Sequence, residues 1–217
     1  YIIAVAEFLA AGDYKDAAER VPQTRYARAE ALLEAGDYDA AIEIFTALGD
    51  YGDAAQRIPQ TRYERAEALL EAGDFDAALA AFRALGDFSD AATRILGIYY
   101  AKAEALLEEG DIDNALVQFV LAGDYEDAVE RVGEIHYTQA EGSLAEGDID
   151  NALAEFALAG DYKDAPERIQ AIHYAEAEEL LAAGDAVGAA AEFEAAGDYE
   201  DAPERAQEIR FAPAEAM

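Results

Sequence analysis

Histidines and carboxylates, the residues best suited to acid–base or metal chemistry, follow a regular arrangement in this sequence. The two histidines, His136 and His173, are 37 residues apart and occupy the same position of two successive repeats. Zinc ligands must converge on one ion, whereas equivalent positions of neighbouring helical repeats lie about 10 Å apart. We therefore interpret the two histidines as substitutions tolerated at a helix edge, and we expect neither a shared metal ion nor a catalytic pair.

The aspartate-rich segments 111–114 and 148–151 raise the question of calcium binding. Calcium needs six to eight converging oxygen atoms, and the spacing of an EF-hand loop is missing. The sequence also has no cysteine, no glycine-rich phosphate loop and no G-x-S-x-G motif. We therefore expect no enzyme activity, no metal site and no cofactor, and we interpret most of these aspartates as helix caps.

Charged and aromatic side chains recur with the same spacing of 37 residues. Half of the arginines form one series: Arg20, Arg57, Arg94, Arg131, Arg168 and Arg205. A glutamate series follows four residues after an aromatic series: Glu30, Glu67, Glu104, Glu141, Glu178 and Glu215 after Tyr26, Tyr63, Tyr100, Tyr137, Tyr174 and Phe211. Two interpretations are open. In the first, the arginines and glutamates neutralise each other within the fold, or the arginines cap backbone carbonyl groups. In the second, the tyrosines and glutamates bind a cationic ligand through cation–π contacts and charged hydrogen bonds.

The overall charge limits the choice of partner. The chain has 48 acidic and 15 basic residues, a formal net charge of −33. Phosphate backbones and anionic lipid would repel such a chain, so we expect no nucleic acid partner. No apolar run approaches the roughly 20 residues of a membrane span, so we also expect no membrane insertion.

The element that positions these residues is a strict internal repeat. The dipeptide Gly-Asp recurs with spacings that alternate between 24 and 13 residues, which makes a unit of 37. A constant period of this size is typical of a solenoid of stacked helical units. We therefore expect one array over residues 1–217, with a partial unit over 1–24, full units over 25–61, 62–98, 99–135, 136–172 and 173–209, and a partial helix over 210–217.

Each unit has the apolar pattern of two helices, which we call helix A and helix B. In the unit 25–61, helix A ends at Gly36 and Asp37 caps helix B. A further helical segment begins at Asp16, Asp53, Asp127, Asp164 and Asp201, each followed three residues later by Glu or Gln, the signature of a capping box. Pro22 and Pro59 are expected to break the continuity between this segment and helix A. Whether a unit has two or three helices stays open.

The segment 29–45, AEALLEAGDYDAAIEIF, resembles the hairpin of the tetratricopeptide repeat (TPR). It has a small residue in helix A (Ala29), the Gly-Asp-Tyr turn, a small residue in helix B (Ala41) and an aromatic residue four positions later (Phe45). It departs from the family in its period of 37 rather than 34 residues. The resemblance implies an all-α, right-handed α-solenoid of helix-turn-helix repeats. It also implies a non-enzymatic scaffold that binds a protein or basic peptide on the concave face lined by helix A. The ligand contacts expected on that face are Tyr26, Glu30, Tyr63, Glu67, Tyr100, Glu104, Tyr137, Glu141, Tyr174 and Glu178.

The chain begins with a helix B that lacks its helix A, and it ends within a helix A. We expect either a slice of a longer array or a subunit that associates head to tail. The second alternative predicts a heterologous contact that propagates into a filament or closes into a ring. Its expected contact residues are Ile2, Val5, Phe8 and Phe211.

Overall fold

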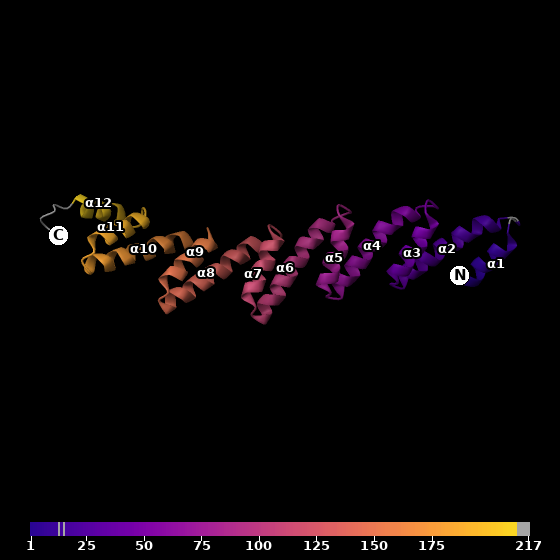
Figure 1. Cartoon of the computed structure of the whole chain (residues 1–217), viewed down its shortest axis with the longest axis horizontal. Helices are drawn as coiled ribbons and strands as arrows, with labels where there is room; N and C mark the ends of the chain where they lie inside the picture. The colour runs from indigo at the N-terminus through magenta and orange to yellow at the C-terminus, as the bar shows by residue number, and fades with distance from the viewer. Residues whose placement is uncertain (13, 15, 212–217) are drawn as a thin grey trace. The chain divides into compact units, whose positions relative to one another are not determined.

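A computed structural model describes residues 1–12, 14 and 16–211, and these residues form α-helices and no strand (Figure 1). The all-α prediction is confirmed. The helices in chain order are α1 (Ile2–Ala11), α2 (Ala17–Glu34), α3 (Tyr38–Leu48), α4 (Ala54–Glu71), α5 (Phe75–Leu85), α6 (Ala91–Glu109), α7 (Ile112–Ala122), α8 (Ala128–Glu146), α9 (Ile149–Ala159), α10 (Ala165–Ala182), α11 (Ala186–Ala195) and α12 (Ala202–Phe211).

The contacts divide the chain into two compact units, Tyr1–Glu104 and Ala105–Met217. In the first unit α1 packs on α2, α2 on α3, α3 on α4 and α4 on α5. The second unit follows the same rule from α7 to α12. Within each unit, a repeat therefore gains its buried surface from its sequence neighbours, as in a helical-repeat array.

Each long helix is continuous: it contains the segment that follows one helix B and also the helix A that comes next in the chain. The structure contradicts the predicted interruption at Pro22 and Pro59, which lie inside α2 and α4. A proline in a helix removes the hydrogen bond to the carbonyl four residues earlier. That residue is the exposed Ala18 or Ala55, so water can hydrate the carbonyl and the helix continues. Each full repeat therefore contains two helices, one long and one short.

The short helices begin and end as predicted. The Asp37 side chain accepts a hydrogen bond from the Ala40 backbone N–H at 3.3 Å and caps α3. The same cap is made by Asp74, Asp111, Asp148 and Asp185. At the other end of α3, Gly49 has φ 55° and ψ −120°, a conformation that is essentially restricted to glycine. The Gly-Asp spacing therefore marks the turns of the fold.

The core is built from one phenylalanine of each helix B and one alanine of each helix A. The phenylalanines are fully buried, with 0% exposure: Phe45, Phe82, Phe119, Phe156 and Phe193. So are the alanines: Ala29, Ala66, Ala103, Ala140 and Ala177. The small alanine lets helix B approach closely, and the phenylalanine fills the space between helices. This packing positions the tyrosine that precedes the alanine on helix A.

The termini of the array differ from its interior. Helix α1 contains no buried residue, whereas the equivalent α3 buries Ala41 and Phe45. At the other end, Arg210 and Phe211 complete α12. The remainder of the partial helix predicted over 210–217, including Glu215, lies outside the described residues.

Two glycines of α8 are expected to respond in opposite ways to substitution by alanine. A Cβ at Gly142 meets no atom within 4 Å, so Gly142→Ala should stabilise the protein by about 0.5–1 kcal/mol. A Cβ at Gly133 would lie 2.9 Å from Tyr162 Cβ and 3.2 Å from the Ala159 carbonyl oxygen. Gly133→Ala should therefore cancel that gain or destabilise by about 1–3 kcal/mol. Urea unfolding followed by circular dichroism compares the two, and equal shifts would contradict the close contact.

Candidate functional site

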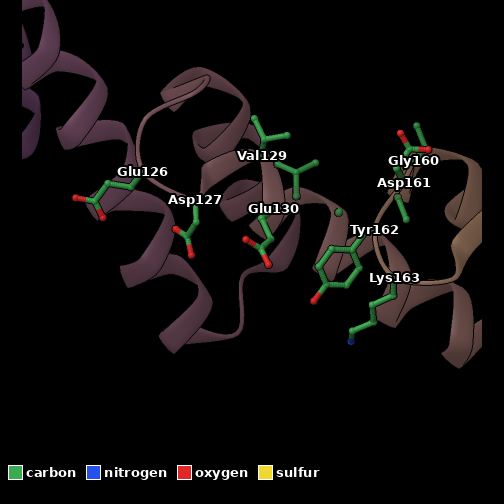
Figure 2. A pocket seen from close by; sticks show the side chains of 12 residues that line it. Glu126, Asp127, Val129, Glu130, Gly160, Asp161, Tyr162 and Lys163 are labelled. Carbon is green, nitrogen blue, oxygen red and sulfur yellow. The ribbon is translucent and has the colours of Figure 1, made fainter.

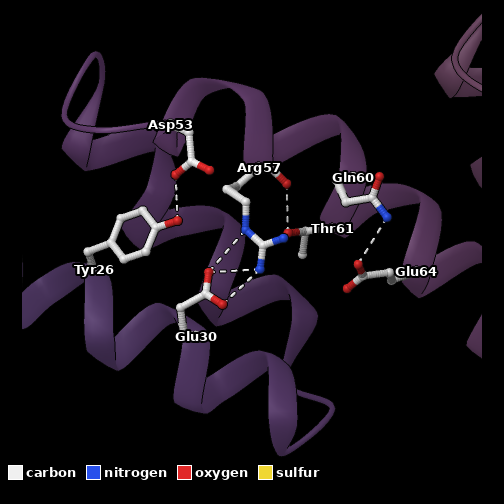
Figure 3. A network of polar contacts seen from close by, with 7 residues as sticks. All are labelled: Tyr26, Glu30, Asp53, Arg57, Gln60, Thr61 and Glu64. Atoms are coloured by element: carbon white, nitrogen blue, oxygen red, sulfur yellow. Dashed lines mark hydrogen bonds and ion pairs between the residues drawn. The ribbon is translucent and has the colours of Figure 1, made fainter.

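Successive long helices are joined by a polar network that uses the predicted tyrosine, glutamate and arginine series. At the first of these junctions, the Tyr26 hydroxyl donates a hydrogen bond of 2.5 Å to Asp53 Oδ1 (Figure 3). The Arg57 guanidinium donates to both carboxylate oxygens of Glu30, at distances from 2.8 to 3.0 Å. Tyr26 and Glu30 lie on α2, and Asp53 and Arg57 lie at the start of the next long helix.

The same junction recurs in both units. Tyr63 donates to Asp90, and Arg94 forms an ion pair of 3.2 Å with Glu67. In the second unit the tyrosine bonds are Tyr137–Asp164 and Tyr174–Asp201, both 2.6 Å. The corresponding ion pairs are Arg168–Glu141 at 2.5 Å and Arg205–Glu178 at 2.6 Å. The interpretation that the arginines and glutamates neutralise each other is confirmed at these four junctions.

Ten residues were predicted as ligand contacts, and the four junctions contain eight of them. Tyr100 and Glu104, the other two, are half-buried on α6 at the end of the first unit. The sequence did not reveal that the tyrosine hydroxyls bond to aspartates 27 residues later. The spacing of 37 shows which positions are equivalent, and it does not show which ones touch.

The capping box predicts that an aspartate before a long helix caps that helix, and this prediction is wrong at Asp16, Asp53, Asp127 and Asp164. These residues precede their helices but make no side-chain capping hydrogen bond. In Asp53 and Asp164 the carboxylate instead accepts the tyrosine hydroxyl. A carboxylate that binds the hydroxyl of another helix points away from its own backbone N–H groups. At Asp53 and Asp164 a tertiary hydrogen bond therefore replaces the local one.

The junctions change the acidity of their phenols and carboxylates. The hydrogen bond to Asp53, followed by burial, raises the pKa of Tyr26 to about 12. The hydrogen bond to Asp164 raises the pKa of Tyr137 to about 12 in the same way. In return, the hydrogen bond from Tyr137 lowers the pKa of Asp164. Each shift favours the neutral phenol that donates to a charged carboxylate.

We expect Tyr26 to ionise about two pH units above an ordinary tyrosine. The folded protein keeps the phenol proton up to about pH 12, whereas the unfolded chain loses it near pH 10.0. The stabilising contribution is therefore complete below pH 10 and is lost as the pH rises towards 12. Ultraviolet titration of phenolate absorbance should show this late component. Tyr26→Phe should remove the contribution of Tyr26 to this late component and leave the contribution of Tyr137. A titration that is complete by pH 11 would contradict the assignment.

The tyrosine ring of each junction also contacts two other aromatic rings. Tyr26 meets Phe45 edge to face at a centroid distance of 5.4 Å and lies 6.5 Å from Tyr51. At the junction of Tyr137, the equivalent ring is Tyr162, at 5.8 Å. There the Lys163 Nζ lies 5.0 Å from the Tyr137 ring centroid and 4.9 Å from that of Tyr162. This pair of rings thus accepts an ammonium group.

A hollow of about 920 Å³ lies beside this lysine, between the start of α8 and the turn from α9 to α10 (Figure 2). Its acidic lining residues are Glu126, Asp127, Glu130 and Asp161. Its apolar residues include Val129 and Leu158, which are 68% and 60% exposed. One sequence signal could have located the hollow. Positions 18, 55 and 92 of the earlier repeats are alanine, whereas the equivalent position here is Val129.

Both histidines contact a glutamate of the following helix B. His136 Nδ1 lies 2.7 Å from Glu155 Oε2, and His173 Nδ1 lies 2.7 Å from Glu192 Oε2. The imidazoles are only 16% and 23% exposed, so they lie between helices rather than at an exposed edge. Near His173, burial and the carboxylate of Glu192 raise the pKa of Glu176.

Of the four residues predicted as head-to-tail contacts, two are exposed and two are half-buried. Ile2 is 67% exposed and Phe211 is 82% exposed. Val5 and Phe8 are half-buried, and Phe8 lies under the guanidinium of Arg20 at 5.8 Å. Among the described residues, no helix combines the length and apolarity needed to cross a bilayer.

Comparison with known proteins agrees with the repeated hairpin. The family model of the tetratricopeptide repeat matches residues 22–45 and 59–84, which cover the helix A and helix B pairs of the first two full repeats. Such repeats generally mediate protein–protein interaction, and the proteins that contain them are typically non-enzymatic scaffolds. No curated protein sequence matches the chain.

One similar solved structure is the crystal structure of a thermophilic TPR protein from Thermus thermophilus. It is 21% identical, with a TM-score of 0.27, and the match covers 87% of this chain and 98% of that one. The assignment rests on the family match and on the hairpins that recur in both units with the same period. This chain is a TPR-like helical-repeat protein.

Proposed function

We propose that the chain is a non-enzymatic scaffold that binds a basic, extended protein segment along its helix A face, the face expected to be concave. The proposed contacts are the tyrosine and glutamate series predicted from the sequence. The observation that carries the proposal is the charge of the junctions. Each contains two carboxylates and one guanidinium, as in Glu30, Asp53 and Arg57, and so keeps one net negative charge after its internal pairing.

The residual charge favours a cationic ligand that has one positive group for each repeat. Glu30 is 39% exposed in its ion pair with Arg57, so its carboxylate remains accessible to a second donor. A carboxylate has about four acceptor positions, and the arginine does not use them all. Lysine or arginine side chains of a ligand would add charged hydrogen bonds at this position.

Lys163 indicates where a ligand lysine would lie. Its ammonium group rests on the rings of Tyr137 and Tyr162. In the first unit, Gly52 and Ser89 occupy the position equivalent to Lys163, beside the ring pairs Tyr26–Tyr51 and Tyr63–Phe88. These residues carry no positive charge, so we propose that a ligand lysine takes the corresponding place at Tyr26 and Tyr63. The acidic and apolar hollow beside Lys163 would accept neighbouring ligand residues.

A lysine-rich peptide, titrated by calorimetry at physiological ionic strength, tests the proposal. Ser89→Lys places a lysine over the Tyr63 junction and should weaken peptide binding by about fivefold, since a cation–π contact contributes about 1 kcal/mol. The backbone already suits this change, because Lys163 has φ 50° and Ser89 has φ 53°. Ala80→Lys adds the same charge to an exposed position of α5 and is the matched control.

The outcomes separate site binding from general charge attraction. A larger loss in Ser89→Lys than in Ala80→Lys supports the ring site. Equal losses would indicate that the peptide binds through general electrostatic attraction rather than at the ring site. An absence of peptide binding at physiological salt would refute the proposed ligand class.

Head-to-tail self-association is a second candidate, favoured by the apolar surface of α1. Ile2 and Ile3 are 67% and 75% exposed, and α1 contains no buried residue. We propose that this surface, with Val5, Phe8 and Phe211, contacts the opposite end of another copy. Sedimentation velocity should then show assembly that grows with concentration and that Ile2→Glu abolishes. A strict monomer at tens of micromolar would exclude it.

A further inference from the structure

The C-terminal repeat brings together three metal-ligating side chains. His173 and Glu176 lie three residues apart on one face of α10, and Glu192 faces them from α11. One ligand atom from each lies within 4.8 Å of the others, and His173 Nδ1 and Glu192 Oε2 are 2.7 Å apart. All three residues are half-buried. A tetrahedral zinc ion with ligands at about 2.0–2.2 Å holds them about 3.3–3.6 Å apart, so small side-chain rotations suffice.

The first unit shows what normally occupies this position. The residues equivalent to Glu176 are basic there. Arg65 contacts Asp39 of the preceding helix B at 3.2 Å, and Lys102 contacts Asp76 at 2.8 Å. Each positive side chain thus neutralises the aspartate across the groove between repeats. Glu176 reverses the charge at this position.

The reversal leaves several carboxylates close together. Glu192 lies beside Glu176 in the three-residue set, and Asp150 and Glu179 add negative charge near it. Asp150 is the equivalent of Asp39 and Asp76, so the basic side chain that would neutralise it is missing. Glu176 and Glu192 are both half-buried, and partly buried carboxylates favour a counter-charge, of which a single histidine supplies at most one.

The preceding repeat provides the contrast. His136 and Glu155 make the same contact of 2.7 Å, but Gln139 stands at the position of Glu176. The histidine–glutamate contact alone accounts for the pair His136–Glu155, without a metal ion. The additional carboxylate of Glu176 is what turns the same pair into a three-ligand set.

We infer that His173, Glu176 and Glu192 bind one divalent transition-metal ion of the zinc type, with water completing its coordination. One imidazole and two carboxylates suit zinc, cobalt or nickel, whereas calcium and magnesium prefer oxygen ligands alone. The ion joins α10 to α11 and supplies the positive charge that Arg65 and Lys102 supply in the first unit. The site therefore fastens the two helices of the last full hairpin.

Titration of the metal-free full chain with Co²⁺ tests the inference, because the visible absorption of cobalt reports its ligands. Excess Ca²⁺ is kept present to occupy non-specific carboxylate sites. We expect one tight site, with a matching rise in melting temperature when Zn²⁺ is added. Glu176→Gln should weaken binding by at least about tenfold, while His136→Gln, the matched control, should leave it unchanged.

Gln139→Glu provides a gain of function that does not depend on damaging the fold. It completes the same ligand set with His136 and Glu155, so the number of tight Co²⁺ ions should rise from one to two. Circular dichroism confirms that each variant is folded. Binding that is unaffected by Glu176→Gln, a second site that fails to appear in Gln139→Glu, or only weak binding at many carboxylates would each overturn the inference.

Discussion

Phe82→Ala should lower the free energy of unfolding of the first unit by about 3–5 kcal/mol, the range for truncating a buried aromatic side chain. Phe82 has 0% exposure and packs in a cluster with Ala66, Leu79 and Ile98. Its ring also meets Tyr63 edge to face at 5.4 Å. The substitution therefore removes apolar contacts, leaves a cavity and loosens the tyrosine of a junction. Denaturant unfolding followed by circular dichroism measures the loss.

Phe8→Ala is the matched control, because Phe8 occupies the same repeat position in α1. There it is only half-buried, on a helix that contains no buried residue. Its truncation should reduce stability by roughly 1 kcal/mol, in proportion to the smaller area removed from contact. Equal losses in the two variants would show that position in the repeat, rather than observed burial, determines the contribution.

Arg57→Met should destabilise the protein by about 2–3 kcal/mol, since hydrogen bonds to charged groups contribute about 1.5–3 kcal/mol. The Arg57 side chain is 26% exposed, binds both oxygens of Glu30 and lies 5.8 Å from the Phe45 ring centroid. Methionine keeps the apolar stem but leaves Glu30 without its partner. A double-mutant cycle with Glu30→Gln isolates the energy of the pair.

Arg20→Met gives the comparison at an equivalent position. Arg20 is 53% exposed and pairs with Asp16 at the start of its own helix at 2.7 Å. Such exposed pairs contribute at most about 1 kcal/mol, so this substitution should have a small effect. If Arg57→Met proved equally harmless, the junction would not contribute measurably to the packing of one repeat on the next.

The same pair of variants separates stability from ligand binding. Arg57→Met changes the net charge of its junction from −1 to −2, because Glu30 and Asp53 remain. If the junctions bind a basic segment as proposed, the variant should bind the lysine-rich peptide more tightly although it is less stable. A purely structural role for Arg57 predicts no such gain.

Much of the architecture follows from local pattern. The spacing of Gly36-Asp37 and Gly49-Asp50 predicts the turns, because left-handed glycines and capping aspartates act over a few residues. The periodic phenylalanines identify the buried face of helix B. Pairing of arginines with glutamates was also predictable, because cations are scarce in a chain of net charge −33.

Interactions between repeats were harder to predict from the sequence, because they depend on more than local residue patterns. Asp53 has the local sequence of a capping box, yet its carboxylate accepts from Tyr26, 27 residues earlier. Pro22 is a helix breaker by local rules, yet α2 continues through it. In the first case a contact with another helix determined the outcome, and in the second the exposure of the Ala18 carbonyl to water did.

The sequence by itself determined the period, the helices, the caps of the short helices and the residues that form the core, since each depends on interactions within one repeat or on burial of a periodic face. The tertiary structure decided which side chains of successive helices meet. It placed Tyr26 on Asp53, Arg57 on Glu30 and Glu176 beside Glu192. Equivalent positions are visible in a sequence because they repeat, whereas contacts depend on how one helix packs on the next, which no repeat of 37 residues specifies.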